Sequence, residues 1–188
     1  MWRRGWPSGK CPASAESGLA AQPKHFLGAL RIQIPRRFTR EDGGAYADIA
    51  FQTASSEIRN PDGRTVFRMD SIEIPAHWSQ VAIDVLAQKY FRKAGVPAEL
   101  KPVPEKHVPE FLWRHAPADA KAAKGAETSA RQVFDRLAGT WAYWGWKGGH
   151  FDSEADAAAY HDEMRYMLAR QMGAPNSPQW FNTGLHWA

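Results

Sequence analysis

Two stretches of this sequence place apolar residues at helical spacing directly behind a capping residue, and any fold must accommodate them. Ser129 precedes the first stretch, and Gln132 lies three residues later, as in a capping box. Ser153 precedes the second, whose first residues are acidic and favour the positive end of a helix dipole. We therefore predict helices from these two serines, with Gly173 and Pro175 ending the second. The apolar residues are Ala130, Val133, Phe134, Leu137, Ala138 and Trp141 in the first, and Ala157, Tyr160, Met164, Met167 and Leu168 in the second.

An aromatic and glycine-rich run, residues 142–149, follows the first of these helices. It either extends the helix or breaks it into a turn, and the sequence leaves both open. Its rings could stack on nucleic-acid bases. Packing in a core or an interface is the simpler interpretation, because an amphipathic helix leads directly into it.

A turn motif upstream predicts a β-hairpin. Residues 60–63 are Asn-Pro-Asp-Gly, in which Pro presets φ and Gly tolerates a positive φ. Residues 48–55 alternate apolar and polar side chains before the turn, and residues 65–75 resume an extended pattern after it. We expect a hairpin or a three-strand meander here, and a further short strand near residues 30–34.

A third helix is predicted over residues 77–94, where apolar residues recur at helical spacing until Gly95. Residues 96–126 follow with five prolines. They predict a long linker or surface loop, with one short helical turn near residues 110–115.

Composition excludes several classes of protein. The chain has 188 residues, 44% hydrophobic and 23% charged, which suits one globular domain with a buried core. No run approaches the roughly 18–20 apolar residues of a membrane helix. The single cysteine, Cys11, excludes a disulfide framework and any mechanism that needs two thiols from this chain. The seven histidines are scattered, so no metal site is predicted.

Charge is concentrated near the start of the chain. Residues 1–40 carry a net charge of +7, and the remainder carries −3. A basic arm can contact nucleic acid or an anionic membrane, but a disordered, solvated tail over residues 1–30 is the simpler interpretation. Prolines interrupt the sequence after Arg3 and Arg4, which argues against an export signal, so we expect a cytoplasmic protein.

Two groups of polar residues, one on a predicted helix and one in the segment after it, invite a functional interpretation. Asp162 and Glu163 lie beside His161 on a helix whose other face is apolar, and we interpret them as a solvated face and not as acid/base residues. Residues 176–188 mix Ser, Asn, Gln and Thr with aromatic residues. That mixture suits a loop that holds a polar ligand, or a structural loop that satisfies its own backbone. Because this segment is so apolar, we expect further protein, downstream in sequence or as a partner, to cover it.

Several blocks of the sequence resemble the adenosylcobalamin-dependent (class II) ribonucleotide reductases. The resemblance runs without a break from about residue 34 to residue 188. Its blocks are SEIRNPDGRTVFRMDSIEIPAHW (56–78), SQVAIDVLAQKYFRKAGVPAEL (79–100), ETSARQVFDRLAGTWAYWGWKGG (127–149), MLARQMGAP (167–175) and NSPQWFNTGLHWA (176–188).

This resemblance implies an enzyme that reduces ribonucleotides to deoxyribonucleotides, a ribonucleoside-diphosphate reductase with a thioredoxin-type reductant. The sequence leaves open whether diphosphates or triphosphates are reduced. In the family, homolysis of the cobalt–carbon bond of adenosylcobalamin generates a radical that passes to a cysteine in a ten-stranded α/β barrel. Further cysteines supply the reducing electrons. All these cysteines lie downstream of the NSPQWFNTG block, so we expect this chain to be an inactive N-terminal portion.

The resemblance and the patterns together predict an α+β, mostly helical chain. Residues 1–30 form the tail, residues 31–76 a β-hairpin or meander region, and residues 77–175 the helical N-terminal reductase domain. Residues 176–188 are the start of the catalytic barrel, whose remainder is missing from this chain.

The resemblance also implies one candidate binding element. Ser177, before Pro178, matches the family's Ser/Thr-Pro element, which contributes a hydroxyl or backbone group near the substrate, and Asn176 is an adjacent candidate. A plain helix-to-strand connector is the alternative. No catalytic or metal-ligating residue and no cobalamin contact is assigned in this chain. The implied partners are a ribonucleotide, the downstream barrel and a thioredoxin-type reductant, without membrane or nucleic acid.

Two rival functions remain open. One is a stand-alone interaction protein that docks on a barrel or partner through residues 176–188. The other is a nucleic-acid-binding module that uses the Trp-rich run and the basic residues Arg3, Arg4, Lys10, Arg31, Arg36, Arg37 and Arg40.

Overall fold

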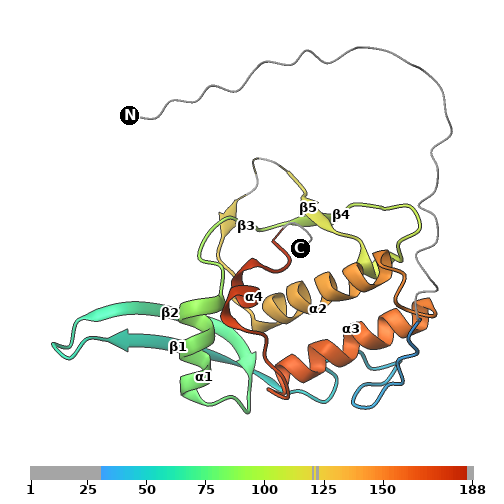
Figure 1. Ribbon diagram of the computed structural model, residues 1–188. Coiled ribbons are helices and arrows are strands. Elements are labelled where there is room, and N and C mark those ends of the chain that lie inside the picture. The colour runs from blue at the N-terminus through green and yellow to red at the C-terminus, as the bar shows by residue number, and fades with distance from the viewer. Residues whose placement is uncertain (1–30, 120, 122, 186–188) are drawn as a thin grey trace, which may run out of the picture.

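Two helices form the centre of the molecule. The computed structural model describes residues 31–119, 121 and 123–185. Helices α2 (Ala130–Lys147) and α3 (Glu154–Ala169) lie side by side, joined by a short connection (Figure 1). The other elements pack around this pair, so its buried faces determine where the rest of the chain can lie.

Both helices begin where the sequence predicts. The hydroxyl of Ser129 accepts from the amide of Arg131, and the side chain of Gln132 completes the capping box. Helix α2 continues through the aromatic run to Lys147, which decides between the two alternatives for that run. Helix α3 ends before the predicted Gly173, because the left-handed residue that follows it is Gln171 (φ 57°).

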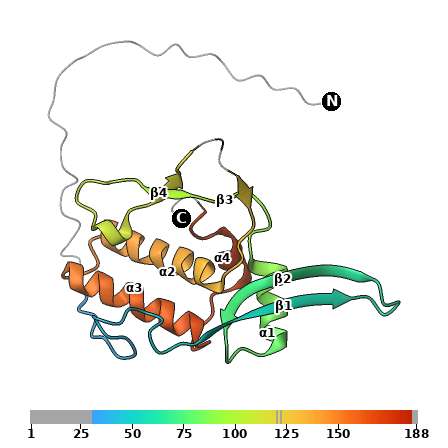
Figure 2. The same cartoon turned by 180° about the vertical axis from the view of Figure 1, so that it is seen from behind.

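A long antiparallel hairpin projects from this centre (Figure 2). It consists of β1 (Phe51–Arg59) and β2 (Thr65–Pro75). The predicted turn is confirmed: Gly63 has a φ of 82° and donates its amide to the carbonyl of Asn60 at 2.9 Å. The three-strand alternative is wrong, because an irregularity at Ser71 (φ 58°) bends β2 without ending it.

The predicted strand near residues 30–34 is reduced to a single bridge between Ile32 and Phe151. Residue 30 itself, like the rest of the predicted tail, lies outside the described residues. After Ile32 the chain runs along α3 toward the hairpin (Figure 1).

The predicted helix over residues 77–94 is shorter than expected at both ends. Helix α1 (Gln80–Val85) begins behind Ser79, whose side chain accepts from the amide of Ala82, and passes into a π-helical turn, η1 (Leu86–Tyr90). Phe91 then adopts an extended conformation and is buried, which ends the helix before the basic residues that follow.

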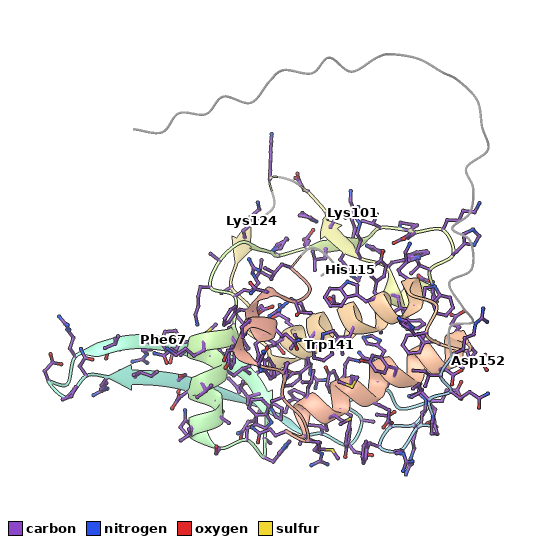
Figure 3. The ribbon with its side chains drawn as sticks, in the orientation of Figure 1. Phe67, Lys101, His115, Lys124, Trp141 and Asp152 are labelled. Atoms are coloured by element: carbon purple, nitrogen blue, oxygen red, sulfur yellow. The ribbon has the colours of Figure 1, made fainter. Side chains whose placement is uncertain are left out.

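The segment predicted as a linker, residues 96–126, contains regular structure. Two small antiparallel pairs cross it, and the expected helical turn is confirmed as a short 3-10 helix. These elements are β3 (Val96–Pro97) with β6 (Lys124–Gly125), β4 (Leu100–Pro102) with β5 (His115–Pro117), and η2 (Glu110–Leu112). Lys101, His115 and Lys124 mark these strands on one side of α2 (Figure 3).

The architecture is α+β, as predicted, with small antiparallel sheets and four α-helices among the described residues. A larger core joins the hairpin base to α1, η1 and the two central helices, with Ile72, Ile74 and Phe134 fully buried. A smaller core lies beneath η2. The last described element is α4 (Ser177–Asn182), which packs on η1 and α2. Among the described residues, none of the helices combines the length and the hydropathy needed to traverse a bilayer.

Candidate functional site

The two residues singled out by resemblance lie together at the start of α4. Asn176 occupies the N-cap position, although its side chain makes no capping hydrogen bond, and Pro178 lies in the first turn. The hydroxyl of Ser177 lies 2.9 Å from the hydroxyl of Tyr90, and either can donate. The segment that the sequence left as a loop or connector is therefore a short helix whose first hydroxyl already has a partner.

Tyr90 is the last residue of the π-helical turn, and its ring supports α4. It stacks on Trp180 with ring centres 5.3 Å apart and on Phe181 at 6.3 Å. Single π-helical turns occur often at functional sites, because the wider turn redirects a side chain. Here the turn directs Tyr90 against α4, so one side chain both supports the aromatic residues and contacts Ser177.

A buried arginine fixes the same segment from α2. The side chains of Arg136 and Glu127 are 3% and 4% exposed and pair at 2.9 Å. Arg136 also donates to the carbonyls of Trp180 at 3.0 Å and Thr183 at 2.7 Å. Glu127 in turn accepts from the backbone amide of Arg92 at 2.9 Å. Every partner of this pair is charged or backbone, which is the arrangement that makes a buried ion pair tolerable.

The segment also approaches α2 too closely for any side chain at one position. Gly184 has a φ of 84°, and a Cβ there would lie 2.4 Å from Cγ of Arg136 and 2.7 Å from Oγ1 of Thr140. Glycine is required both by the backbone conformation and by this contact. The segment from α4 to Leu185 is thus held at a defined place on α2.

A cavity of about 620 Å³ opens beside this segment. Amide and hydroxyl groups of Gln179, Asn182 and Thr183 line one side, and Tyr143 and Trp144 line the other. Such a mixture of apolar walls and few polar groups suits a small polar ligand. Ser177 and Asn176 are not among the lining residues, so the structure places them next to this cavity and not within it.

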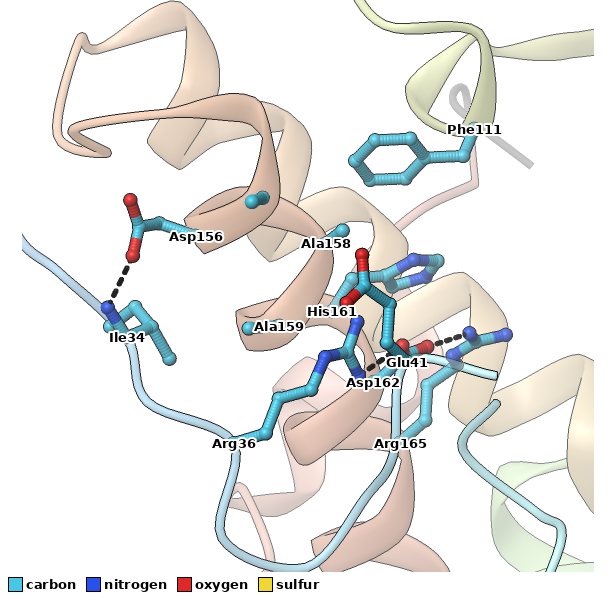
Figure 4. Close-up of a pocket in the computed structure, with 11 residues that line it drawn as sticks. Ile34, Arg36, Glu41, Phe111, Asp156, Ala158, Ala159, His161, Asp162 and Arg165 are labelled. Carbon is cyan, nitrogen blue, oxygen red and sulfur yellow. Dashed lines mark hydrogen bonds and ion pairs between the residues drawn. The ribbon is translucent and has the colours of Figure 1, made fainter. Parts of the chain in front are cut away.

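The interpretation of residues 161–163 as a solvated face is wrong. His161, Asp162 and Glu163 are each less than 9% exposed, because the chain before the hairpin covers them. Arg36 forms an ion pair with Asp162 at 2.6 Å, and Figure 4 shows this contact. The surface that sequence periodicity assigned to solvent is occupied by residues more than 120 positions away.

Glu163 collects donors from this covering segment. Its carboxylate accepts from the amides of Arg37, Phe38 and Thr39 at 2.9–3.2 Å and from the hydroxyl of Thr39 at 2.8 Å. Burial alone would raise the pKa of Glu163, but these hydrogen bonds outweigh it and hold the pKa below its usual value. The group is therefore a fixed anion that anchors the chain, and as a carboxylate it can only accept hydrogen bonds.

His161, in contrast to Glu163, is neutral, because at this residue the effect of burial is not outweighed by other interactions. Burial, with a smaller contribution from the positive charge of Arg165, lowers its pKa to about 3, and Asp162 opposes this only weakly. Its ring stacks against Phe111 at 5.9 Å, and Nε2 has no hydrogen-bond partner among the described residues (Figure 4).

The Trp-rich run of α2 is mostly committed to packing. Trp141 packs against the larger core (Figure 3), and Nε1 of Trp146 donates to the carbonyl of His107 at 2.8 Å. Trp144 is exposed. Of the basic residues named for a nucleic-acid-binding module, Arg36 is engaged in an ion pair with Asp162, and Arg31, Arg37 and Arg40 are exposed.

Sequence reasoning missed Tyr90, Glu127 and Arg136 as positioning residues. A signal for Arg136 exists: it lies on the buried stripe of α2, between Val133 and Thr140, where an unpaired charge is rarely tolerated. Its partner could not be inferred, because it lies outside the helix. Among the described residues, no group of three His, Cys, Asp or Glu side chains could hold a metal ion.

Comparisons with known proteins agree with the resemblance in sequence. The model of a family described as class II vitamin B12-dependent ribonucleotide reductase matches residues 52–171. A vitamin B12-dependent ribonucleotide reductase of Agrobacterium fabrum is 64% identical over 165 residues, and one of Bradyrhizobium diazoefficiens is 61% identical over 165 residues; each match covers 84% of this chain. One of Rhodopirellula baltica is 29% identical over 178 residues. The matched part is 13% of the first two relatives and 15% of the third, so the chain spans a small fraction of their length.

Proposed function

Because the chain belongs to the class II, vitamin B12-dependent ribonucleotide reductases, and matches their N-terminal part, we propose that it forms the N-terminal region of an enzyme that makes deoxyribonucleotides from ribonucleotides. The chemistry we propose for the whole enzyme is thiyl radical chemistry initiated by adenosylcobalamin. The observation that carries the proposal is the family match over residues 52–171.

We propose that the segment from Asn176 to Leu185 contributes to binding of the ribonucleotide, with the hydroxyl or backbone of Ser177 near the substrate. Three features support this. The segment is held by a buried ion pair on α2, its first hydroxyl is oriented by Tyr90, and a cavity with polar groups adjoins it. A binding element benefits from this arrangement, because groups fixed before the substrate arrives lose little freedom when they bind it.

We propose that the isolated chain is inactive. The proposed chemistry needs one cysteine as the radical carrier and two more as reductants, and this chain has Cys11 alone, outside the described residues. The remaining cysteines would be supplied by the ten-stranded barrel, which residues 176–188 would begin. A thioredoxin-type protein would restore the cysteines after each turnover.

The described residues do not fit the cobalamin itself. The cavities of 590, 620 and 630 Å³ are in the range of sites for drug-sized ligands. A corrin ring with its nucleotide and adenosyl groups is far larger than such a ligand. We therefore assign no cofactor contact to this chain and place cobalamin binding in the rest of the reductase. We place the enzyme in the cytoplasm, where its ribonucleotide substrates are found.

The test compares the whole reductase with the 188-residue chain. Both are incubated with adenosylcobalamin, a dithiol and each ribonucleoside di- or triphosphate in turn, and deoxyribonucleotide is measured. We expect product from the whole enzyme with one phosphorylation class and none from the chain alone. Product from the chain alone, or none from the whole enzyme with any ribonucleotide, would contradict the proposal.

A further inference from the structure

A second cavity, of about 590 Å³, lies between α2, α3 and the two segments that carry η2 and β3. Four arginines from four different parts of the chain line it, namely Arg92, Arg114, Arg136 and Arg165. Glu127 and Asp135 are the carboxylates of its wall. The proposed function makes no use of this space, so a ligand bound here would be independent of that function.

The positive charge of the wall is only partly balanced. Arg136 is paired with Glu127, and Arg165 is paired with Asp135 and Asp162. Arg92 and Arg114 are half-buried, and neither forms an ion pair with any carboxylate of the described residues. Two arginines therefore line this cavity without an ion pair among the described residues, and a half-buried guanidinium favours an oxyanion.

The carboxylate that acts on Arg114 through its charge is already occupied. Glu105 accepts from Nζ of Lys147 at 2.5 Å and from the hydroxyl of Tyr143 at 2.8 Å. These hydrogen bonds hold the pKa of Glu105 below its usual value, and Arg114 adds only a weaker charge effect. Glu105 thus leaves Arg114 available to another acceptor.

Two buried polar atoms also lack partners, on residues that line both this cavity and the cavity of about 630 Å³. Nε2 of His161 and Nε of Arg165 make no hydrogen bond to the described residues, although both residues line this cavity. His161 is 8% exposed. Nε of an arginine can only donate, so the group missing beside Arg165 must be an acceptor. A neutral imidazole can donate or accept at Nε2, so His161 does not oppose an acceptor there.

We propose that this cavity binds a small phosphate-bearing molecule, with Arg92 and Arg114 contacting the phosphate. A tetrahedral phosphate accepts hydrogen bonds from several directions, which suits arginines that converge from separate segments. The volume is within the range of sites for small molecules. Phe111, whose ring stacks on His161, supplies a flat apolar wall for the rest of the molecule.

Equilibrium dialysis of the full chain against labelled inorganic phosphate tests this, with tripolyphosphate and adenosine triphosphate as further probes and acetate as the carboxylate control. We expect saturable binding of one phosphate-bearing probe per chain and none of acetate. Tighter binding of adenosine triphosphate than of tripolyphosphate would show that the ligand of the cavity is an organic phosphate. Equal binding of the two probes would show that it is a free polyphosphate.

Arg92→Gln and Arg114→Gln should each weaken binding about tenfold or more, since each removes a hydrogen bond between charged groups. Arg64→Gln is the matched control, because Arg64 is exposed at the hairpin turn and forms no ion pair with the described residues, and it should leave binding unchanged. Circular dichroism confirms that the variants keep the fold. No saturable binding of any phosphate probe, as expected if water alone fills the cavity, overturns the proposal. So does an equal loss in all three variants, which would show non-specific attraction.

Discussion

The two ends of the described chain are each anchored to a central helix by a buried charge, but the two anchors are built differently. On α3, Glu163 accepts from neutral donors of residues 37–39 and needs no counter-ion. On α2, Arg136 donates to the carbonyls of the C-terminal segment and also needs Glu127 to balance its charge. Loss of one hydrogen bond to Glu163 should therefore weaken the first anchor only in part. Loss of either Arg136 or Glu127 leaves the other charge buried and unpaired, which disrupts the second anchor as a whole.

The largest effect is expected for Arg136→Met. It leaves Glu127 buried without a counter-charge, so we expect a loss of about 3–5 kcal/mol in the free energy of unfolding, measured by urea denaturation. The double variant Arg136→Met, Glu127→Met should recover part of this loss, because both charges are then removed while the carbonyls of Trp180 and Thr183 still lack their donor. Arg131→Met, at a partly exposed ion pair, is the control and should cost about 1 kcal/mol or less. A loss for Arg136→Met no larger than that of the control would contradict a paired anchor.

Gly184→Ala should have the next largest effect. The positive φ costs about 1–2 kcal/mol for alanine, and the contact with Arg136 adds about 1–3 kcal/mol of overpacking. Gly63→Ala is a matched control, since Gly63 has nearly the same φ, 82°, and open space around its Cβ. Urea denaturation gives the loss in the free energy of unfolding for each variant, and the difference between the two losses is the cost of the contact with Arg136. Equal losses would show that the segment is not pressed against α2.

Glu163→Gln should weaken the other anchor by about 2 kcal/mol, because the neutral amide oxygen accepts less strongly than the carboxylate it replaces. The loss should be local. Hydrogen exchange at the amides of Arg37, Phe38 and Thr39 should accelerate, while exchange at Thr183 stays unchanged. Faster exchange at both ends of the chain would show that the two anchors are not independent.

The smallest effect concerns pH. The folded-state pKa of His161, about 3, lies below the ordinary 6.5, so the unfolded chain takes up the proton first as the pH falls. The free energy of unfolding is therefore at its full value above about pH 7.5 and declines as the pH drops through 6.5, by about 1.4 kcal/mol at pH 5.5. Glu163, whose pKa lies below 4.5, acts only at lower pH. His161→Gln should abolish the decline between pH 7.5 and 5.5 in urea titrations, and an unchanged slope would contradict the burial of a neutral imidazole.

What could be predicted from the sequence was local. Caps at Ser129 and Ser153 and the turn ending at Gly63 depend on residues a few positions apart, and all three are confirmed. The choice of Ser177 depended on resemblance and stays a prediction, although the structure shows what holds it.

What could not be predicted was non-local. The burial of His161 and Glu163 depends on a segment more than 120 residues away, which no helical periodicity reveals. The position of Arg136 on the buried stripe of α2 is visible in the sequence, but its carboxylate partner and its two carbonyl partners lie outside the helix and could not be inferred. Tyr90 falls inside the predicted helix over residues 77–94, because the π-helical turn that redirects it leaves no clear pattern in the sequence.

We propose above all that the segment from Asn176 to Leu185, which α2 holds in place, presents Ser177 to a ribonucleotide. Steady-state kinetics of the whole reductase carrying Ser177→Ala tests it most directly. The account predicts a KM for the ribonucleotide raised by roughly 2–10-fold, the loss of one hydrogen bond, with an unchanged urea midpoint for the protein. An unaltered KM and kcat/KM would contradict it.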